Sequence, residues 1–331
     1  MKRIFIFLLA LNAVFTQAQK PAFYLGFDEI FDNREFNGRY GMPQTIFAER
    51  INSGLRFSFD SVHSIRTGIN YMYENGHELL AVRPQIDLSY HYSGSRFEAA
   101  FGSFSRRQLM DYPLILLSDS LDYYRPNLEG GSLAWNWTVG RIKGRAHYWI
   151  DWMGRQTTQV RESILTGLDL KVEAGIVYAK LITVRYHLAR TRAEDDQNSV
   201  YDEGAFLAML GLELSKVFGF DELDISSGYM KIYEWPRRTR LNWFQGWYSE
   251  IRAGRGIFDF KAAHYLGEGF ALRFGHPLYA ADHYGRLDFF IDPFRSSRVR
   301  SKIGWSMHLF PGEGVYHSQQ LLISVFLRPL S

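Results

Sequence analysis

Apolar and polar residues alternate along many short stretches of this chain, and the clearest of these runs covers residues 299–309. In that run the large apolar side chains fall on one face of an extended strand and the charged or small ones mostly on the other, because side chains alternate along a strand. Similar runs occur at 86–92, 97–101 and 133–139. An apolar face opposite a polar face is typical of a strand that separates lipid from water. The pattern therefore predicts an all-β protein.

The connections between these runs alternate between short and long. We count about sixteen runs of roughly 10 residues, the length of a tilted spanning strand, with fourteen as the alternative count. Short connections such as Ser93-Gly94 alternate with long ones such as 105–129, and the last long one is placed at 311–317. Outer-membrane barrels have tight periplasmic turns and long extracellular loops. The sequence therefore predicts an up-and-down antiparallel transmembrane β-barrel. The runs start near Ala22, Thr45, Val62, Val82, Ser95, Gly131, Ile142, Arg161, Ala174, Gly204, Asp221, Gly246, Ile257, Gly285, Arg298 and Gln319.

Two soluble all-β folds compete with this interpretation. A propeller would repeat a motif every 40 to 50 residues or so, and the sequence has no such repeat. A sandwich would bury the apolar face and leave the other face to water, which the alternation alone permits. The aromatic content of 16% favours the membrane barrel, because aromatic girdles mark its two interfaces.

The N-terminus has the composition of an export signal. Met1-Lys2-Arg3 precedes an apolar stretch and the small residues before Gln19, so we expect a signal peptide at residues 1–18 and a single outer-membrane barrel at 19–331. The chain has no cysteine, which excludes disulfides and a thiol nucleophile. A net charge of +3 with scattered Lys and Arg predicts no nucleic-acid partner. The expected partners are outer-membrane lipid and lipopolysaccharide, the barrel-assembly machinery and small polar solutes. A homo-oligomer is compatible with the sequence.

The inward face of the predicted barrel carries many charges. Because an unpaired buried ion costs several kcal/mol, the interior should be wet or crossed by ion pairs. A barrel of about sixteen strands can leave an aqueous channel. The small excess of Arg suits anionic or neutral solutes, but such ladders are also purely structural. The predicted pore-lining residues are Arg50, Arg56, Arg66, Arg83, Asp87, Arg96, Glu98, Arg145, Asp151, Glu213, Glu250, Arg252, Asp259, Lys261, Arg286, Asp288, Arg300 and Lys302.

The connection at 105–129 is long and apolar, which is uncommon unless it packs on something. It either folds into the barrel as a constriction or caps the neighbouring loops. Its candidate constriction residues are Tyr112, Asp119, Asp122, Tyr123, Tyr124 and Arg125. The acidic stretch Glu194-Asp195-Asp196-Gln197-Asn198 could bind a hard cation, although such runs are usually solvated loop tips. We predict no metal and no cofactor.

Two arrangements of residues resemble barrel enzymes only weakly. His91 and Ser93 have the spacing of the His and Ser of outer-membrane phospholipase A, but the topology places them at a periplasmic turn. Asp282-His283, in a long connection, is the nearest match to an omptin-like protease, yet adjacent residues on a strand point apart. We therefore predict that the protein is not an enzyme.

The stretches Phe31-Asp32-Asn33-Arg34-Glu35-Phe36 and Gln44-Thr45-Ile46-Phe47, with the segment 117–127, resemble uncharacterised porin-like outer-membrane barrels of Bacteroidota-type bacteria. The resemblance covers most of the mature chain and brings no catalytic residue. One departure is the end of the chain, where Phe326 is followed by five more residues instead of closing the sequence. The functional prediction is a porin-like channel for passive passage of small polar solutes. The alternatives are a receptor, adhesin or capsule- or secretion-associated anchor and, third, a lipid-active barrel enzyme.

Overall fold

A computed structural model describes residues 21–36, 38–109, 111–157, 160–190 and 199–327. These residues form one closed barrel of sixteen antiparallel strands, in which each strand pairs with its sequence neighbours and β1 pairs with β16. The prediction of an up-and-down barrel with about sixteen strands is confirmed. The strands are β1 (Ala22–Glu35), β2 (Gln44–Ser58), β3 (His63–Glu74), β4 (Gln85–Ser93), β5 (Phe97–Ser105), β6 (Asn127–Val139), β7 (Ile142–Gly154), β8 (Ser163–Ala174), β9 (Val177–Leu188), β10 (Tyr201–Glu213), β11 (Glu222–Pro236), β12 (Asn242–Arg255), β13 (Phe258–Gly267), β14 (His283–Ile291), β15 (Val299–Phe310) and β16 (Gly314–Phe326).

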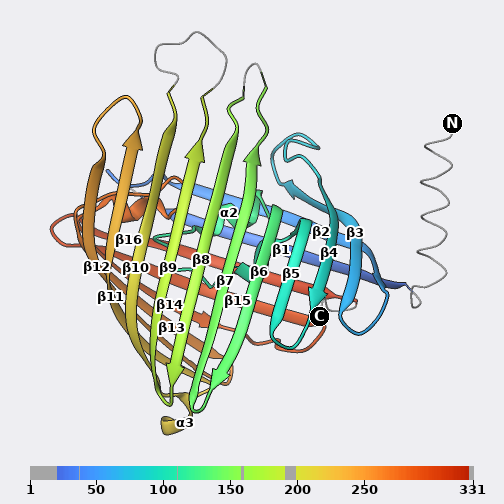
Figure 1. The fold of residues 1–331 in the computed structure, drawn as a ribbon. Coiled ribbons are helices and arrows are strands. Elements are labelled where there is room, and N and C mark those ends of the chain that lie inside the picture. Colours follow the sequence, from blue (N-terminus) through green and yellow to red (C-terminus); the bar gives the residue numbers. More distant parts are fainter. Residues whose placement is uncertain (1–20, 37, 110, 158–159, 191–198, 328–331) are drawn as a thin grey trace.

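The two ends of the barrel differ, as Figure 1 shows. Tight turns close one end. In two of them, Gly140 and Gly175 have a φ of 61° and 69°, a left-handed backbone conformation that residues with a Cβ atom rarely adopt. Longer hairpins extend from the other end. Because outer-membrane barrels have short turns in the periplasm, we call the second end external. The short helix α3 (Ser215–Phe218) lies in a periplasmic connection.

The outward face of the wall is apolar and aromatic over much of its surface. Leu133 and Trp135 on β6 are 49% and 46% exposed, whereas Ala134 between them is 2% exposed and points inward. The same alternation holds on β14, where Phe289 is exposed and Asp288 is buried. This is the arrangement of a wall that faces lipid. None of the helices in the described part of the chain is long and apolar enough to cross a membrane.

One connection differs from its prediction. The last external connection covers only 311–313, because β15 and β16 remain paired up to Phe310 and Gly314. The expected long loop at 311–317 is therefore wrong. Gly312 and Gly314 both take positive φ, which lets the chain reverse at once, and His317 and Gln319 belong to the strand.

Two external connections fold back into the barrel. The first, residues 106–126, contains the 3-10 turn η1 (Arg106–Leu109) and the helix α2 (Asp119–Tyr124); the second, residues 268–282, contains η2 (Pro277–Ala280). Figure 1 shows α2 within the outline of the barrel. We call these two segments together the plug. A barrel of about sixteen strands is too wide for its wall side chains to fill. Where the lumen is closed, inserted segments such as the plug fill it.

Candidate functional site

The plug fills the external half of the lumen with apolar side chains. Ile115, Leu116 and Leu117 are 1–2% exposed and pack in one cluster with Leu278 and with inward-facing wall residues. Those wall residues include Trp149, Leu165, Ile182, Val184, Leu207, Met230, Ile232, Tyr248, Tyr265 and Tyr284. The large inward-facing apolar residues of these strands, which an open channel would leave in water, are thus buried against the plug.

The two plug segments hold each other. The backbone N–H of His276 donates to the carbonyl of Leu114 at 2.8 Å, and that of Ser118 donates to the carbonyl of Phe274 at 2.7 Å. Glu203 on β10 anchors the second segment by accepting from the backbone N–H of Arg273 at 2.7 Å. The backbone groups that a buried loop would otherwise leave unpaired are in this way satisfied.

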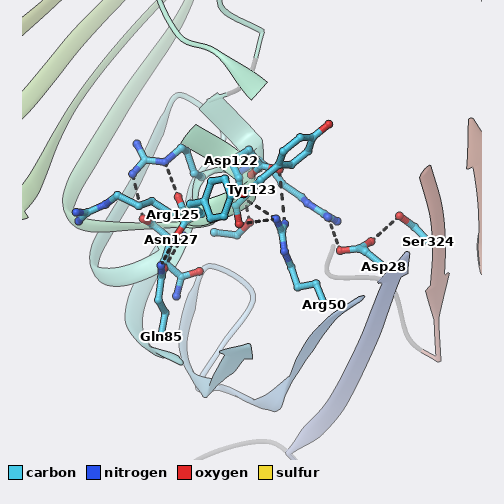
Figure 2. Close-up of polar contacts among 12 residues, drawn as sticks. Asp28, Arg50, Gln85, Asp122, Tyr123, Arg125, Asn127 and Ser324 are labelled. Carbon is cyan, nitrogen blue, oxygen red and sulfur yellow. Dashed lines mark hydrogen bonds and ion pairs between the residues drawn. The ribbon is translucent and has the colours of Figure 1, made fainter. Parts of the chain in front are cut away.

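Three arginines fix the first segment to the wall, and Figure 2 shows part of this arrangement. Arg50 on β2 donates to the carbonyls of Asp122 and Tyr123 at 2.9 and 3.0 Å. Arg106 forms a fully buried ion pair with Asp151 on β7. Arg107 pairs with Asp28 on β1, which also accepts from the Ser324 hydroxyl of β16 at 2.5 Å. These contacts join the segment to β1, β2, β7 and β16.

Burial shifts the pKa of several titratable groups of the plug. Burial lowers the pKa of His276 well below its usual value, and Arg286 nearby adds to the effect. Burial also raises the pKa of the Asp119 carboxyl. It raises the pKa of Tyr124 to about 12, with a further contribution from the Glu74 carboxylate that accepts its hydrogen bond. Each shift favours the neutral form, as expected where water is scarce.

The periplasmic half of the lumen is hollow and charged. A cavity of about 1050 Å³ is lined by Lys143, Arg145 and Lys171 together with Asn136 and Asp169. Two smaller cavities of about 460 and 410 Å³ lie against the plug and share Asp111 with the first. Ion pairs cross this region, for example Lys180 with Asp169 at 3.1 Å and Arg145 with Glu98 at 3.3 Å. The hollow is thus a vestibule that ends at the plug.

The predicted pore-lining residues fall into three groups. Arg83 lies in the connection before β4 and is exposed, and Arg96 lies in a periplasmic turn at the edge of the large cavity. Arg50, Arg66, Asp87, Asp151, Glu250, Arg286 and Asp288 face inward but are buried, several of them by the plug. The others are on inward-facing strand positions and are less buried, namely Arg56, Glu98, Arg145, Glu213, Arg252, Asp259, Lys261, Arg300 and Lys302.

The candidate constriction residues all lie in the inserted segment. Tyr112 and Tyr123 are buried, and the hydroxyl of Tyr112 accepts a 2.9 Å hydrogen bond from the Trp149 indole. Asp119 and Asp122 line the smallest of the three cavities. Arg125 donates to the carbonyl of Met153 at 2.6 Å, so it holds the segment against β7. The acidic stretch 194–198 and the signal peptide at 1–18 lie outside the described residues, and the described residues contain no group of three potential metal ligands.

Neither of the weak enzyme matches forms the arrangement that its spacing suggested. His91 bonds to Ser89 at 2.9 Å, not to Ser93, and Ser89 in turn donates to Asp87. This group faces the lumen, where lipid has no access. Asp282 accepts from the backbone of Gly269, whereas its neighbour His283 turns outward. The acid and the imidazole therefore point apart, as predicted.

His283 belongs to a polar group on the lipid-facing wall that the sequence analysis did not recognise. Its Nε2 lies 2.8 Å from Nε2 of His264 on β13. Ser249 on β12 is paired directly with His264 in the sheet register. Its hydroxyl lies 2.6 Å from that of Ser227 on β11, which accepts from the Trp247 indole at 2.7 Å. Strand parity puts all four polar residues outward, and the available signal was their break in an otherwise apolar outward face.

A second outward polar group lies on β16, β1 and β2. Asn33 donates to Gln319 at 2.6 Å and accepts from Thr45 at 2.8 Å. Glu35 accepts from Asn33 at 3.1 Å and is paired with His317 in the register. This group has carboxylate, amide and hydroxyl groups, but its hydroxyl and its imidazole are on different strand pairs, with β1 between them. It therefore lacks the adjacent hydroxyl and imidazole of the first group.

Searches for similar proteins agree with the fold. The structure of a loop-deletion mutant of OmpT, an outer membrane protein of Vibrio cholerae, is similar with a TM-score of 0.57 at 7% identity, over 94% of this chain and 99% of that one. Salmonella typhi OmpF in complex with daunomycin gives 0.55 at 8% identity, over 93% and 99%. Pseudomonas putida OprB gives 0.51 at 8% identity, over 96% of each chain. These likenesses show the fold, a β-barrel of the outer-membrane type.

A search of the curated proteins found no significant match. A family model described as Lipid A 3'-O-deacylase-type, however, matches residues 15–298. That description is of an enzyme activity, so the prediction that the protein is not an enzyme is wrong. Since the match covers well over half of the sequence, the chain belongs to the Lipid A 3'-O-deacylase-type family.

Proposed function

We propose that the protein hydrolyses an ester bond of an outer-leaflet lipid, with Ser249, His264 and His283 as its catalytic residues. The observation that carries the proposal is the Ser249 hydroxyl opposite an imidazole that is itself hydrogen-bonded to a second imidazole on the lipid-facing wall. A nucleophile, a base and a third group that orients the base form the usual arrangement of acyl hydrolases. The family match to a lipid deacylase supports the same class of reaction.

We assign roles to Ser249 and His264 from the sheet register and from the contact between the two imidazoles. Directly paired strand residues have Cβ atoms about 4.5–5.5 Å apart, which is within reach of a hydrogen bond between a Ser and a His side chain. Because Nε2 of His264 contacts His283, its Nδ1 is the atom left for Ser249. His264 would take the proton of Ser249 as the oxygen attacks the ester carbonyl, and would return it to the leaving alcohol. Water would then release the fatty acid from the acyl-serine.

The substrate class follows from where these side chains point. Trp247 and Leu266, on the same outward face, are 51% and 53% exposed, so the group is bordered by lipid-contacting residues. His283 is the first residue of β14, at its external end. A soluble substrate would have to enter the bilayer to reach Ser249, whereas an outer-leaflet lipid already lies beside it.

The test is lipid hydrolysis by the purified barrel in vesicles that contain lipid A, with released fatty acid measured by mass spectrometry. We expect Ser249→Ala to lower the rate at least about 100-fold, since removing a nucleophile removes the covalent route. Ser53→Ala is the matched control, because Ser53 faces outward on β2, away from the group. Equal rates for wild type and Ser249→Ala would contradict the proposal, as would wild-type protein that releases no fatty acid from any lipid offered.

A porin-like channel is the second candidate, and the charged vestibule of about 1050 Å³ favours it. Passage would require the plug to move, because its apolar cluster closes the external half. The Lys and Arg residues of the vestibule would then favour anionic solutes. Stepwise currents from folded wild-type protein in planar bilayers would support this candidate, and their absence would reject it.

A further inference from the structure

A group of cations projects outward where β9, β10 and β11 reach the external end. Arg185 on β9 and Arg237, just after β11, both bind the carboxylate of Asp202 on β10, at 2.9 and 2.7 Å. His187 lies 2.9 Å from the same carboxylate. Lys231 on β11 faces outward on the same wall. We call Arg185, Lys231 and Arg237 the basic patch.

The basic patch keeps an excess of positive charge toward the surroundings. The patch has three permanent cations, and the only carboxylate that the described ion pairs assign to it is Asp202, which binds Arg185 and Arg237; this leaves +2 even with His187 neutral. The Asp202 side chain is only 2% exposed, whereas those of Arg185 and Arg237 are 54% and 38% exposed. The buried carboxylate of Asp202 therefore holds the two guanidinium groups in place, and the sides of these groups that face away from Asp202 stay exposed. Guanidinium groups held in this way match phosphate oxygens, to which they donate in pairs.

Aromatic rings fix the depth of these cations. The guanidinium of Arg237 lies 3.4 Å from the ring centre of Trp235, and the ammonium of Lys231 lies 4.9 Å from that of Trp243. Outward-facing Trp and Tyr residues mark the level of the lipid headgroups in outer-membrane barrels. The cations therefore lie beside outward aromatic rings, as expected for groups that meet the phosphates of lipid headgroups.

We propose that the basic patch binds the phosphate of an outer-leaflet lipid headgroup. Below it on the same outward faces follow Tyr229 and Trp247, and then Ser227 and Ser249. A lipid with its phosphate at Lys231 can therefore lay its acyl chains along the wall toward Ser249. Naming this phosphorylated lipid as the substrate rests on the proposed hydrolysis, whereas its binding does not.

The test is lipid binding by native mass spectrometry of the purified barrel, titrated with lipid A and with chemically dephosphorylated lipid A. We expect the double variant Arg185→Gln/Arg237→Gln to bind lipid A at least about 10-fold more weakly, because each guanidinium loses charge-assisted hydrogen bonds. Lys143→Gln/Arg145→Gln is the matched control, since it removes the same charge from the lumen. Wild-type protein should bind the dephosphorylated lipid as weakly as the double variant binds lipid A.

Loss of both arginines leaves Asp202 buried without them, so Lys231→Gln is a second variant that does not disturb that carboxylate. It should weaken lipid A binding several-fold with unchanged heat-modifiable migration. Equal affinity for the two lipids, or equal affinity of the lumen and patch variants, would overturn the inference. Inorganic phosphate that displaces the lipid at equal concentration would do so too. Ser249→Ala separates the two proposals: it should bind lipid A like wild type without cleaving it.

Discussion

The two halves of the lumen differ although the same sixteen strands enclose them. In the external half, Ile115, Leu116 and Leu117 pack against large apolar wall residues, Arg106 is ion-paired with Asp151, and Arg50 donates to backbone carbonyls of the plug. In the periplasmic half, Lys143 and Arg145 border a hollow of about 1050 Å³. The packed plug supports the barrel wall in the external half, whereas the hollow periplasmic half has room for water. The proposed lipid hydrolysis accordingly uses the lipid-facing surface and not the lumen.

Shortening the first plug segment should reduce the difference between the halves. Deletion of residues 110–121 takes Ile115, Leu116 and Leu117 out of the apolar cluster, so we expect a barrel that conducts ions in planar bilayers in large steps where wild type shows none, because a barrel of about sixteen strands leaves an aqueous channel when empty. Arg145→Gln, which alters only the vestibule, should leave the currents as in wild type. A deleted protein that folds, judged by heat-modifiable migration, yet stays closed would show that another segment seals the lumen.

Breaking the buried ion pair should have the next largest effect. Arg106→Ala leaves the Asp151 carboxylate buried without its cation, which costs about 3–5 kcal/mol of unfolding free energy. Arg145→Ala opens the exposed pair with Glu98 and should cost no more than about 1 kcal/mol. Denaturant titrations of both variants in the same lipid measure the contrast. Equal losses would mean that the two halves are equally hydrated.

A single methyl group should separate the plug from the outer wall by a smaller amount. Ile115, 1% exposed, lies in the centre of the plug, and Ile115→Val should cost about 0.5–1.5 kcal/mol because the cavity it leaves cannot collapse fully. Ile142→Val on the outer wall, where lipid fills the gap, is the matched control. The same titration applies, and an indistinguishable midpoint for the two variants would argue against a tightly packed plug.

Most of the barrel can be predicted from the sequence. Alternating residues at 299–309 specify an outward and an inward face, and the tight connections specify antiparallel neighbours, so strand number and topology follow from local pattern. The ends of the strands are harder to predict from the alternation, because paired strands extend as far as their backbones can form hydrogen bonds with each other. For this reason β16 begins at Gly314, well before its alternation becomes clear at Gln319. Cleavage after Ala18 stays a prediction.

The plug and the outward polar group could not be predicted in the same way. Leu322 interrupts the polar inward face of β16 in the pattern, and its partner, the cluster around Tyr123, lies about two hundred residues away along the chain. Ser249, His264 and His283 come from three strands and meet only through the register, which a one-residue slip would destroy. The resemblance to porin-like barrels pointed to the lumen, whereas the family match points to lipid chemistry.

The most direct test of the account is covalent labelling of the folded barrel in lipid vesicles with a fluorophosphonate lipid, which reacts with activated serines, followed by peptide mass spectrometry. Ser249 should carry the adduct in wild-type protein, and His264→Gln should lower the labelling rate at least about 100-fold, because the base that activates the hydroxyl is gone. His317→Gln, which changes an outward histidine on β16, should label like wild type. Labelling that is absent from Ser249, or that persists at full rate without His264, would contradict the account.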